Sequence, residues 1–155
     1  MKLTRATNYA VRALVEIAKC RSLECADLRT LAREMKAPEA FLGKVLQRLK
    51  RAGLVEGTRG AHGGYRLARD ARQMTVRDVV EAMEGRTTLS ACLSREDRPG
   101  TKPCPRKRTC GARKLWSRLE GRLNEALESE TIGRLAGGRT KRPGKRRGCG
   151  TTRRR

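Results

Sequence analysis

Three amphipathic segments in quick succession, followed by a glycine-rich turn, most constrain what this chain folds into. Apolar residues recur every three or four positions over 8–19 and 27–36, which predicts two helices that each bury one face. A third helix is expected over 38–51, because Pro38 suits a first helical turn and Gly53 suits a C-terminal stop. The short gap between the second and third segments indicates a helix-turn-helix.

A β-hairpin is expected directly after the third helix. Residues 54–56 and 65–68 are typical of two short strands, and the stretch GTRGAHGG lies between them. Its glycines permit tight turns and let the loop lie close to a phosphate backbone. The order helix, turn, helix, hairpin is that of a winged helix. We therefore predict a mainly α fold with a small β-hairpin wing.

The C-terminal half is expected to hold an irregular segment and then a long helix. Thr75 and Asp78 resemble a capping box, which predicts a helix that ends near Gly85. Periodicity is lost over 86–111 and returns as an apolar stripe made of Leu115, Leu119, Leu123, Ala126 and Leu127. A long helix with one apolar seam is typical of dimerisation. The alternative is a helix that packs back on its own domain.

Charge separates a basic body from a more basic tail. The 155 residues include 38 Lys and Arg but 16 Asp and Glu, which gives a formal net charge of +22. A tail with nine basic side chains and no acid is predicted to be disordered. The basic body favours nucleic acid as the partner, before a membrane surface. The expected units are a winged-helix domain (1–85), a cysteine-bearing loop (86–111), a dimerisation helix (112–136) and the tail (137–155).

Several classes of protein are not expected from this sequence. There is no run of eighteen apolar residues and no apolar segment of the kind that a secretory signal needs near the N-terminus. A cytoplasmic location is therefore expected. An enzyme is not expected, because there is no phosphate loop, paired-carboxylate motif or nucleophile–base pair, and His62 alone does not build a triad.

The outer face of the third helix and the hairpin turn carry the candidate DNA contacts. A helix in the major groove presents side chains to base edges, while basic groups of a wing meet phosphates or the minor groove. The residues suited to these tasks are Lys44, Gln47, Arg48, Arg51, Arg59, His62 and Arg66. A solvated basic face used for protein contacts is the alternative, and the large positive charge favours DNA.

Three of the six cysteines, Cys92, Cys104 and Cys110, lie in the irregular segment. A reducing compartment disfavours disulfides, so clustered cysteines there indicate metal or redox chemistry. Thiolates suit zinc or an iron–sulfur cluster, and the paired spacing that zinc commonly uses is absent. A zinc staple and three unligated thiols remain the alternatives.

Four parts of the chain resemble bacterial transcription regulators of the IscR, NsrR, RirA and CymR type, the Rrf2 family. The matching parts are LTRATNYAVRAL at 3–14, PEAFLGKVLQRLKRAGLV at 38–55, RGAHGGYRLAR at 59–69, and the cysteine loop followed by Trp116. The resemblance covers about residues 1–135. It implies a homodimeric winged-helix regulator that acts on an operator in double-stranded DNA, with repression as the expected action.

The resemblance also implies that Cys92, Cys104 and Cys110 hold a [2Fe–2S] or [4Fe–4S] cluster whose state controls operator binding. It supplies no fourth ligand. IscR-like members have a histidine where this chain has Arg113, and NsrR-like members have an acid where this chain has Asn8. The signal therefore stays open between iron, nitric oxide and redox state. The alternatives are a cluster-free regulator controlled by thiols or a partner, and a zinc-stapled architectural nucleic-acid binder.

Overall fold

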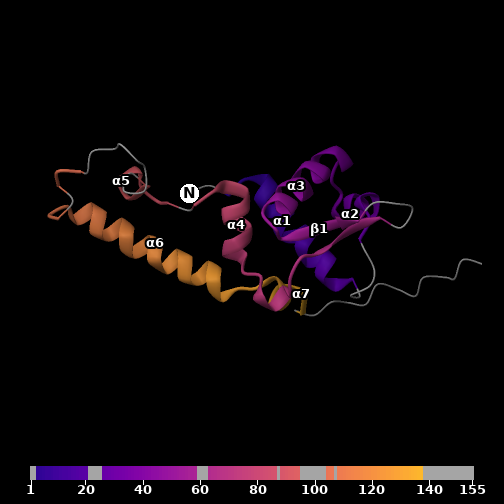
Figure 1. The fold of residues 1–155 in the computed structure, drawn as a ribbon. Helices are drawn as coiled ribbons and strands as arrows, with labels where there is room; N and C mark the ends of the chain where they lie inside the picture. The colour runs from indigo at the N-terminus through magenta and orange to yellow at the C-terminus, as the bar shows by residue number, and fades with distance from the viewer. Residues whose placement is uncertain are drawn as a thin grey trace, which may run out of the picture.

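The chain is mainly helical, with one two-stranded antiparallel hairpin among the residues that the structure describes. The computed structural model describes residues 3–20, 26–58, 63–86, 88–94, 104–106 and 108–137. The N-terminal elements are α1 (Arg5–Lys19), α2 (Leu28–Met35), α3 (Glu39–Arg51), β1 (Val55–Thr58) and β2 (Gly64–Leu67). They are followed by η1 (Ala71–Gln73), α4 (Val76–Glu84), α5 (Ala91–Ser94), α6 (Gly111–Ser129) and α7 (Ile132–Gly137) (Figure 1). This order confirms the winged-helix fold.

Local side-chain chemistry explains where the helices begin and end. Asp27 caps α2 by accepting a hydrogen bond from the Thr30 backbone N–H, and the capping box of Thr75 and Asp78 opens α4 as predicted. Gly53 and Gly85 have φ angles of +69° and +81°, which favour glycine after a helix. Pro38 is the N-cap of α3, one residue earlier than the first-turn position we expected.

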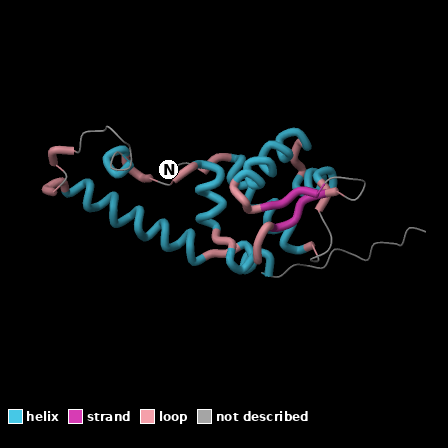
Figure 2. The backbone as a smooth tube through the Cα atoms, in the orientation of Figure 1, coloured by secondary structure: helices cyan, strands magenta, loops and turns pink. Residues whose placement is uncertain are grey.

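The hairpin is attached to the helices by its second strand. β1 and β2 form an antiparallel pair (Figure 2). In this pair Gly57 lies opposite Tyr65 and Glu56 lies opposite Arg66. Ala26 and Tyr65 also exchange two backbone hydrogen bonds of 2.9 Å each, just before α2 begins. The hairpin is therefore held against the helix-turn-helix at the level of Tyr65.

The core lies between α1, α2, α3 and α4. Its α1 wall includes the small residues Ala10 and Ala13, which are fully buried and let neighbouring helices approach closely. Most of the remaining core is supplied by leucine, valine, isoleucine and methionine side chains from all four helices and from β1, and Met74 and Ile132 complete it. The helical periods predicted from the sequence therefore produce the buried faces observed here.

The C-terminal helix differs from the single helix predicted over 112–136. The α6 helix ends at Ser129, and the backbone then becomes extended at Glu130. Thr131 forms an antiparallel bridge with Thr75, and the N–H of Ile132 donates to the carbonyl of Met74 at 2.8 Å. Ile132 is fully buried in the core. This long-range backbone pairing interrupts the helix and places α7 against α1 and η1.

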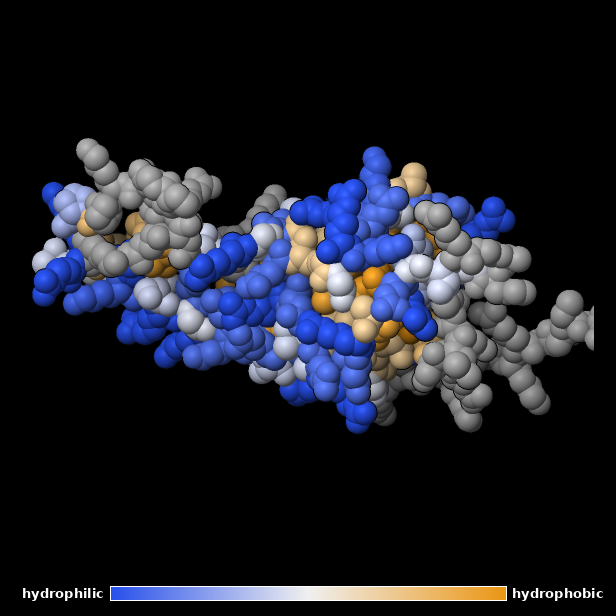
Figure 3. Space-filling model, in the orientation of Figure 1, coloured by the Kyte–Doolittle hydropathy of each residue, from blue (hydrophilic) through white to orange (hydrophobic). Residues whose placement is uncertain are grey.

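The α6 helix extends away from the core (Figures 1 and 2), and several of its apolar side chains are exposed. None of its residues is buried, although its C-terminal half contacts α4 and carries the ion pair between Arg77 and Glu128. Leu115, Trp116 and Leu119 are 41%, 40% and 38% exposed. The face of α6 in view in Figure 3 is mainly hydrophilic, as expected for an amphipathic helix.

No helix in the described part of the chain is both long enough and apolar enough to cross a membrane.

Candidate functional site

Candidate DNA contacts lie side by side on the exposed face of α3. Its buried residues are Leu42, Val45, Leu46 and Leu49. Successive residues of an α-helix are turned by about 100°, so Lys44, Gln47 and Arg51 lie on the side opposite the core. All three side chains are exposed. The structure thus brings three predicted contacts to one outward face, and their role in binding stays a prediction.

One edge of the exposed face of α3 lies toward the hairpin. The Lys50 ammonium nitrogen lies 3.7 Å from the point that a Cβ of Gly57 would occupy. Lys50 and Gln47 line a recess with Tyr65 and Leu28, which we call the notch. Lys50 is not among the contacts predicted from the sequence, because the helical period places it between the buried and outer faces of α3. Lys50 becomes part of a recess only because the hairpin packs beside this edge of α3.

The other edge of the exposed face of α3 lies toward α4 and the N-terminus of α1. The Glu84 carboxylate accepts hydrogen bonds from the Thr4 N–H at 3.0 Å, from the Thr4 hydroxyl at 2.7 Å and from the Thr7 hydroxyl. The hydrogen bond from Thr7 contributes most to holding the pKa of Glu84 below its ordinary value of 4.5. The bonds from Thr4 and the nearby positive charge of Arg48 act in the same direction. Glu84 therefore connects α4 to the start of α1, near Arg48 of α3, at the point where the cysteine-bearing segment begins.

Replacing Thr7 with valine is expected to make folding stability less sensitive to acid. The lowered pKa of Glu84 contributes stability above about pH 4.5, and this contribution is lost as the pH falls through the folded-state pKa. Thr7 is 1% exposed, so its hydroxyl has no ready replacement from water. We expect T7V to lose about 1 kcal/mol near pH 7 and less in acid, measured by urea unfolding.

Thr7→Ser is the matched control for this experiment, because serine keeps the hydroxyl that reaches Glu84. It is expected to retain the pH dependence of the parent protein. An equal loss of stability for T7V at neutral and acid pH would contradict the assignment to the Glu84 carboxylate.

The hairpin places Arg66 on the face opposite Tyr65, because side chains alternate along a strand. The Arg66 guanidinium donates to Glu56 Oε2 at 2.9 and 2.7 Å. Both side chains are exposed, so this pair is open to exchange with a phosphate. The other two predicted wing contacts, Arg59 and His62, lie outside the described residues.

The cysteine-bearing segment is attached to the start of α6. Cys92 lies in α5, Cys110 is the N-cap of α6, and the thiols of both and of Cys104 are free and half-buried. The Arg113 guanidinium donates to the Cys92 carbonyl at 3.0 Å, which ties α5 to the first turn of α6. The Leu89 N–H also donates to Glu120 at 3.0 Å. Cys92 and Cys110 are therefore held at the same end of α6.

The cysteines fit an iron–sulfur cluster in donor chemistry, but the described geometry does not assemble a site. Three free thiols in one segment are the ligand type that such clusters use. Within the described ranges, no three His, Cys, Asp or Glu side chains lie close enough together to hold a metal ion. Arg113 has no acceptor atom and is no candidate for the fourth ligand.

The comparisons with known proteins agree with this arrangement. The family model Rrf2, described as an iron-dependent transcriptional regulator, matches residues 3–138. Protein aau3 of Rhizobium meliloti is 37% identical over 132 residues, which are 85% of this chain and 82% of that protein.

Two solved structures of regulators are similar to most of this chain. The structure of CymR, the global cysteine regulator of B. subtilis, has a TM-score of 0.73 at 26% identity and covers 90% of this chain and 99% of its own. The IscR structure from T. potens has a TM-score of 0.66 at 25% identity, with 87% and 86% covered.

Proposed function

Because the chain belongs to the Rrf2 family of transcriptional regulators, we propose that it is a homodimeric repressor whose operator affinity is set by an iron–sulfur cluster. The family is not one of enzymes. The observation that carries the DNA-binding part is the composition of the outer face of α3. Its residues from 43 to 51 include five long polar or basic side chains and no acid, and they are Lys44, Gln47, Arg48, Lys50 and Arg51.

The exposed apolar residues of α6 support a homodimer. A 19-residue helix with no buried residue gains little from tertiary packing, and short isolated helices are marginal in water. A second copy of the same helix would cover Leu115, Trp116 and Leu119. Two winged-helix domains held together in this way would present two α3 helices to two half-sites. Helix-turn-helix dimers read operators in this manner.

The three thiols support the cluster as the sensing group. Cys92, Cys104 and Cys110 would hold it, and the family model is described as iron-dependent. When bound, an iron–sulfur cluster supplies a centre that responds to iron supply, nitric oxide or redox state. The cysteine-bearing segment would connect the cluster to DNA binding through its two ends. One end follows Glu84, which lies near Arg48 of α3, and the other end is Cys110, the N-cap residue of α6.

Direct control by thiols is the second candidate function. The free thiols and the dispersed positions of the potential ligands in the described residues favour it. The similar structure of CymR belongs to a protein called a global cysteine regulator. In this form of the proposal, chemistry at a thiol or the docking of another protein replaces the cluster.

An absorption spectrum of the protein purified without oxygen separates the two candidates. Iron and sulfide would be counted per chain, and operator fragments would be selected from genomic DNA. A brown protein with near-stoichiometric iron and sulfide is expected. A colourless, iron-free protein that still selects an operator would support thiol or partner control instead.

Deleting residues 138–155 is expected to flatten the salt dependence of DNA binding. The tail carries nine Lys and Arg, and each phosphate contact contributes about 0.9 to the slope of log Kobs against log salt. The preference for operator over scrambled DNA should persist, because α3 is unchanged. Titrations at several salt concentrations measure both, with an equally long Gly/Ser tail as control. A collapse of the operator preference would contradict this role.

A further inference from the structure

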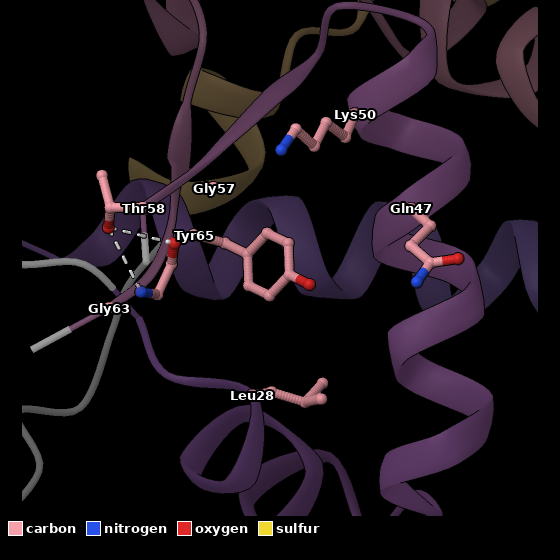
Figure 4. Close-up of a pocket in the computed structure, with 8 residues that line it drawn as sticks. Leu28, Gln47, Lys50, Gly57, Thr58, Gly63 and Tyr65 are labelled. Carbon is pink, nitrogen blue, oxygen red and sulfur yellow. Dashed lines mark hydrogen bonds between the residues drawn. The ribbon is translucent and has the colours of Figure 1, made fainter. Parts of the chain in front are cut away.

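The notch lies between the wing-side edge of α3 and the hairpin. It has a volume of about 380 Å³. Gln47 and Lys50 of α3 form one wall, Gly57 and Tyr65 of the hairpin form another, and Leu28 at the start of α2 closes one end (Figure 4). The notch is therefore built from the helix-turn-helix and the wing together.

Polar groups from both walls are directed into this space. Figure 4 shows the Lys50 amine extending from α3 toward the hairpin and the Tyr65 ring extending from the hairpin toward α3. In the described part of the chain, no acidic side chain lines the notch. Among the described residues, neither the Lys50 ammonium nor the Tyr65 hydroxyl has an ion pair or hydrogen bond. A cation, a hydroxyl and the Gln47 amide thus offer donors without a carboxylate to compete for them.

A glycine keeps the space beside these donors open. A Cβ at Gly57 would lie 3.6 Å from the Tyr65 ring and 3.7 Å from the Lys50 ammonium nitrogen, which is ordinary contact distance. A larger side chain at this position would project into the notch beside Tyr65 and Lys50. The wall is also fixed in place, since Tyr65 exchanges two backbone hydrogen bonds with Ala26.

The position of Lys50 on α3 decides which part of DNA it meets. Lys44 and Arg51 lie at the centre of the outer face, where a recognition helix meets base edges. Lys50 lies to one side of them, toward the hairpin. A helix in the major groove has a sugar-phosphate strand along each side, so this edge faces backbone and not bases.

We infer that the notch binds a phosphodiester group of the DNA backbone, with Lys50 and Tyr65 as its donors. The inference rests on the proposed function and specifies how one edge of α3 is held in the groove. Contacts to phosphate fix the position of a protein on duplex DNA and carry no sequence information of their own. The notch therefore contributes affinity and register, while Lys44 and Arg51, which do not line it, remain candidates for base recognition.

The test is a salt titration of full-length Lys50→Gln with an operator fragment and a scrambled fragment. The variant is expected to bind both DNAs several-fold more weakly and to lower the salt slope by about 0.9. Lys114→Gln on α6 removes the same charge away from the notch and should leave the slope unchanged. Gly57→Val, which narrows the notch beside Lys50 and Tyr65 and keeps the charge, should also weaken binding to both fragments.

A neutral methylphosphonate placed at single positions of the operator locates the contact. One position should weaken the parent protein and leave Lys50→Gln unaffected, and Tyr65→Phe should lose part of the same effect. An unchanged affinity and slope for Lys50→Gln, with operator selection intact in the parent, would overturn the inference alone. Weaker binding to the operator but not to scrambled DNA would assign Lys50 to a base and overturn it too. A parent protein without operator preference would instead refute the proposed function.

Discussion

Replacing Cys104 with alanine is expected to yield a colourless protein with almost no iron or sulfide and an altered operator affinity. Three thiolates are the complete cysteine set of the segment, so losing one removes a third of its thiolate donors. Coupling between a sensing site and a binding site is typically about 1–3 kcal/mol, which corresponds to about 5- to 150-fold in affinity. Binding to scrambled DNA should change far less, because phosphate contacts do not need a fixed distance between the two winged-helix domains.

The measurement combines iron and sulfide analysis with titrations of operator and scrambled DNA under anaerobic conditions. Cys20→Ala is the matched control, since Cys20 is also half-buried but lies at the end of α1. It should keep both the colour and the affinity. An equal loss for operator and scrambled DNA would contradict cluster control. Full operator binding by a colourless parent protein would favour the thiol-controlled alternative.

The winged-helix fold was predictable because its signals are local. The spacing of Leu42, Leu46 and Leu49 predicts the buried face of α3, and the glycines after Leu54 require a turn where the hairpin forms. The break in the C-terminal helix was not predictable in this way. Ile132 continues an apolar stripe, and only the pairing of Thr131 with the distant Thr75 shows that the helix ends before it.

The candidate site could be predicted in part for the same reason. Helical period alone places Lys44, Gln47 and Arg51 on one outward face. Lys50 depends on the packing of the hairpin against α3, which no local pattern specifies. Spacing along the chain indicates that the cysteines share a segment, but it does not determine how far apart their sulfur atoms lie.

The apolar face of α6 leads to the second large expected effect. Replacing both Leu115 and Leu119 with glutamate is expected to convert the proposed dimer into a monomer. These residues are one helical turn apart and 41% and 38% exposed, so each copy would bring two unpaired carboxylates into a buried interface. We expect the dimer to weaken at least about a thousandfold and operator affinity to fall with it, because a monomer engages one half-site.

Sedimentation over a range of protein concentrations measures the change, and circular dichroism verifies that the winged helix remains folded. Ser117→Glu with Gly121→Glu is the matched control, because it adds two charges at the same spacing on the other side of α6. A Cβ at Gly121 meets nothing within 4 Å among the described residues, so the helix accommodates the change. A dimer that survives the leucine substitutions, or that the control also dissociates, would contradict pairing through this face. A dimer lost only with the leucines would make the two α6 helices the element that sets the distance between the two recognition helices.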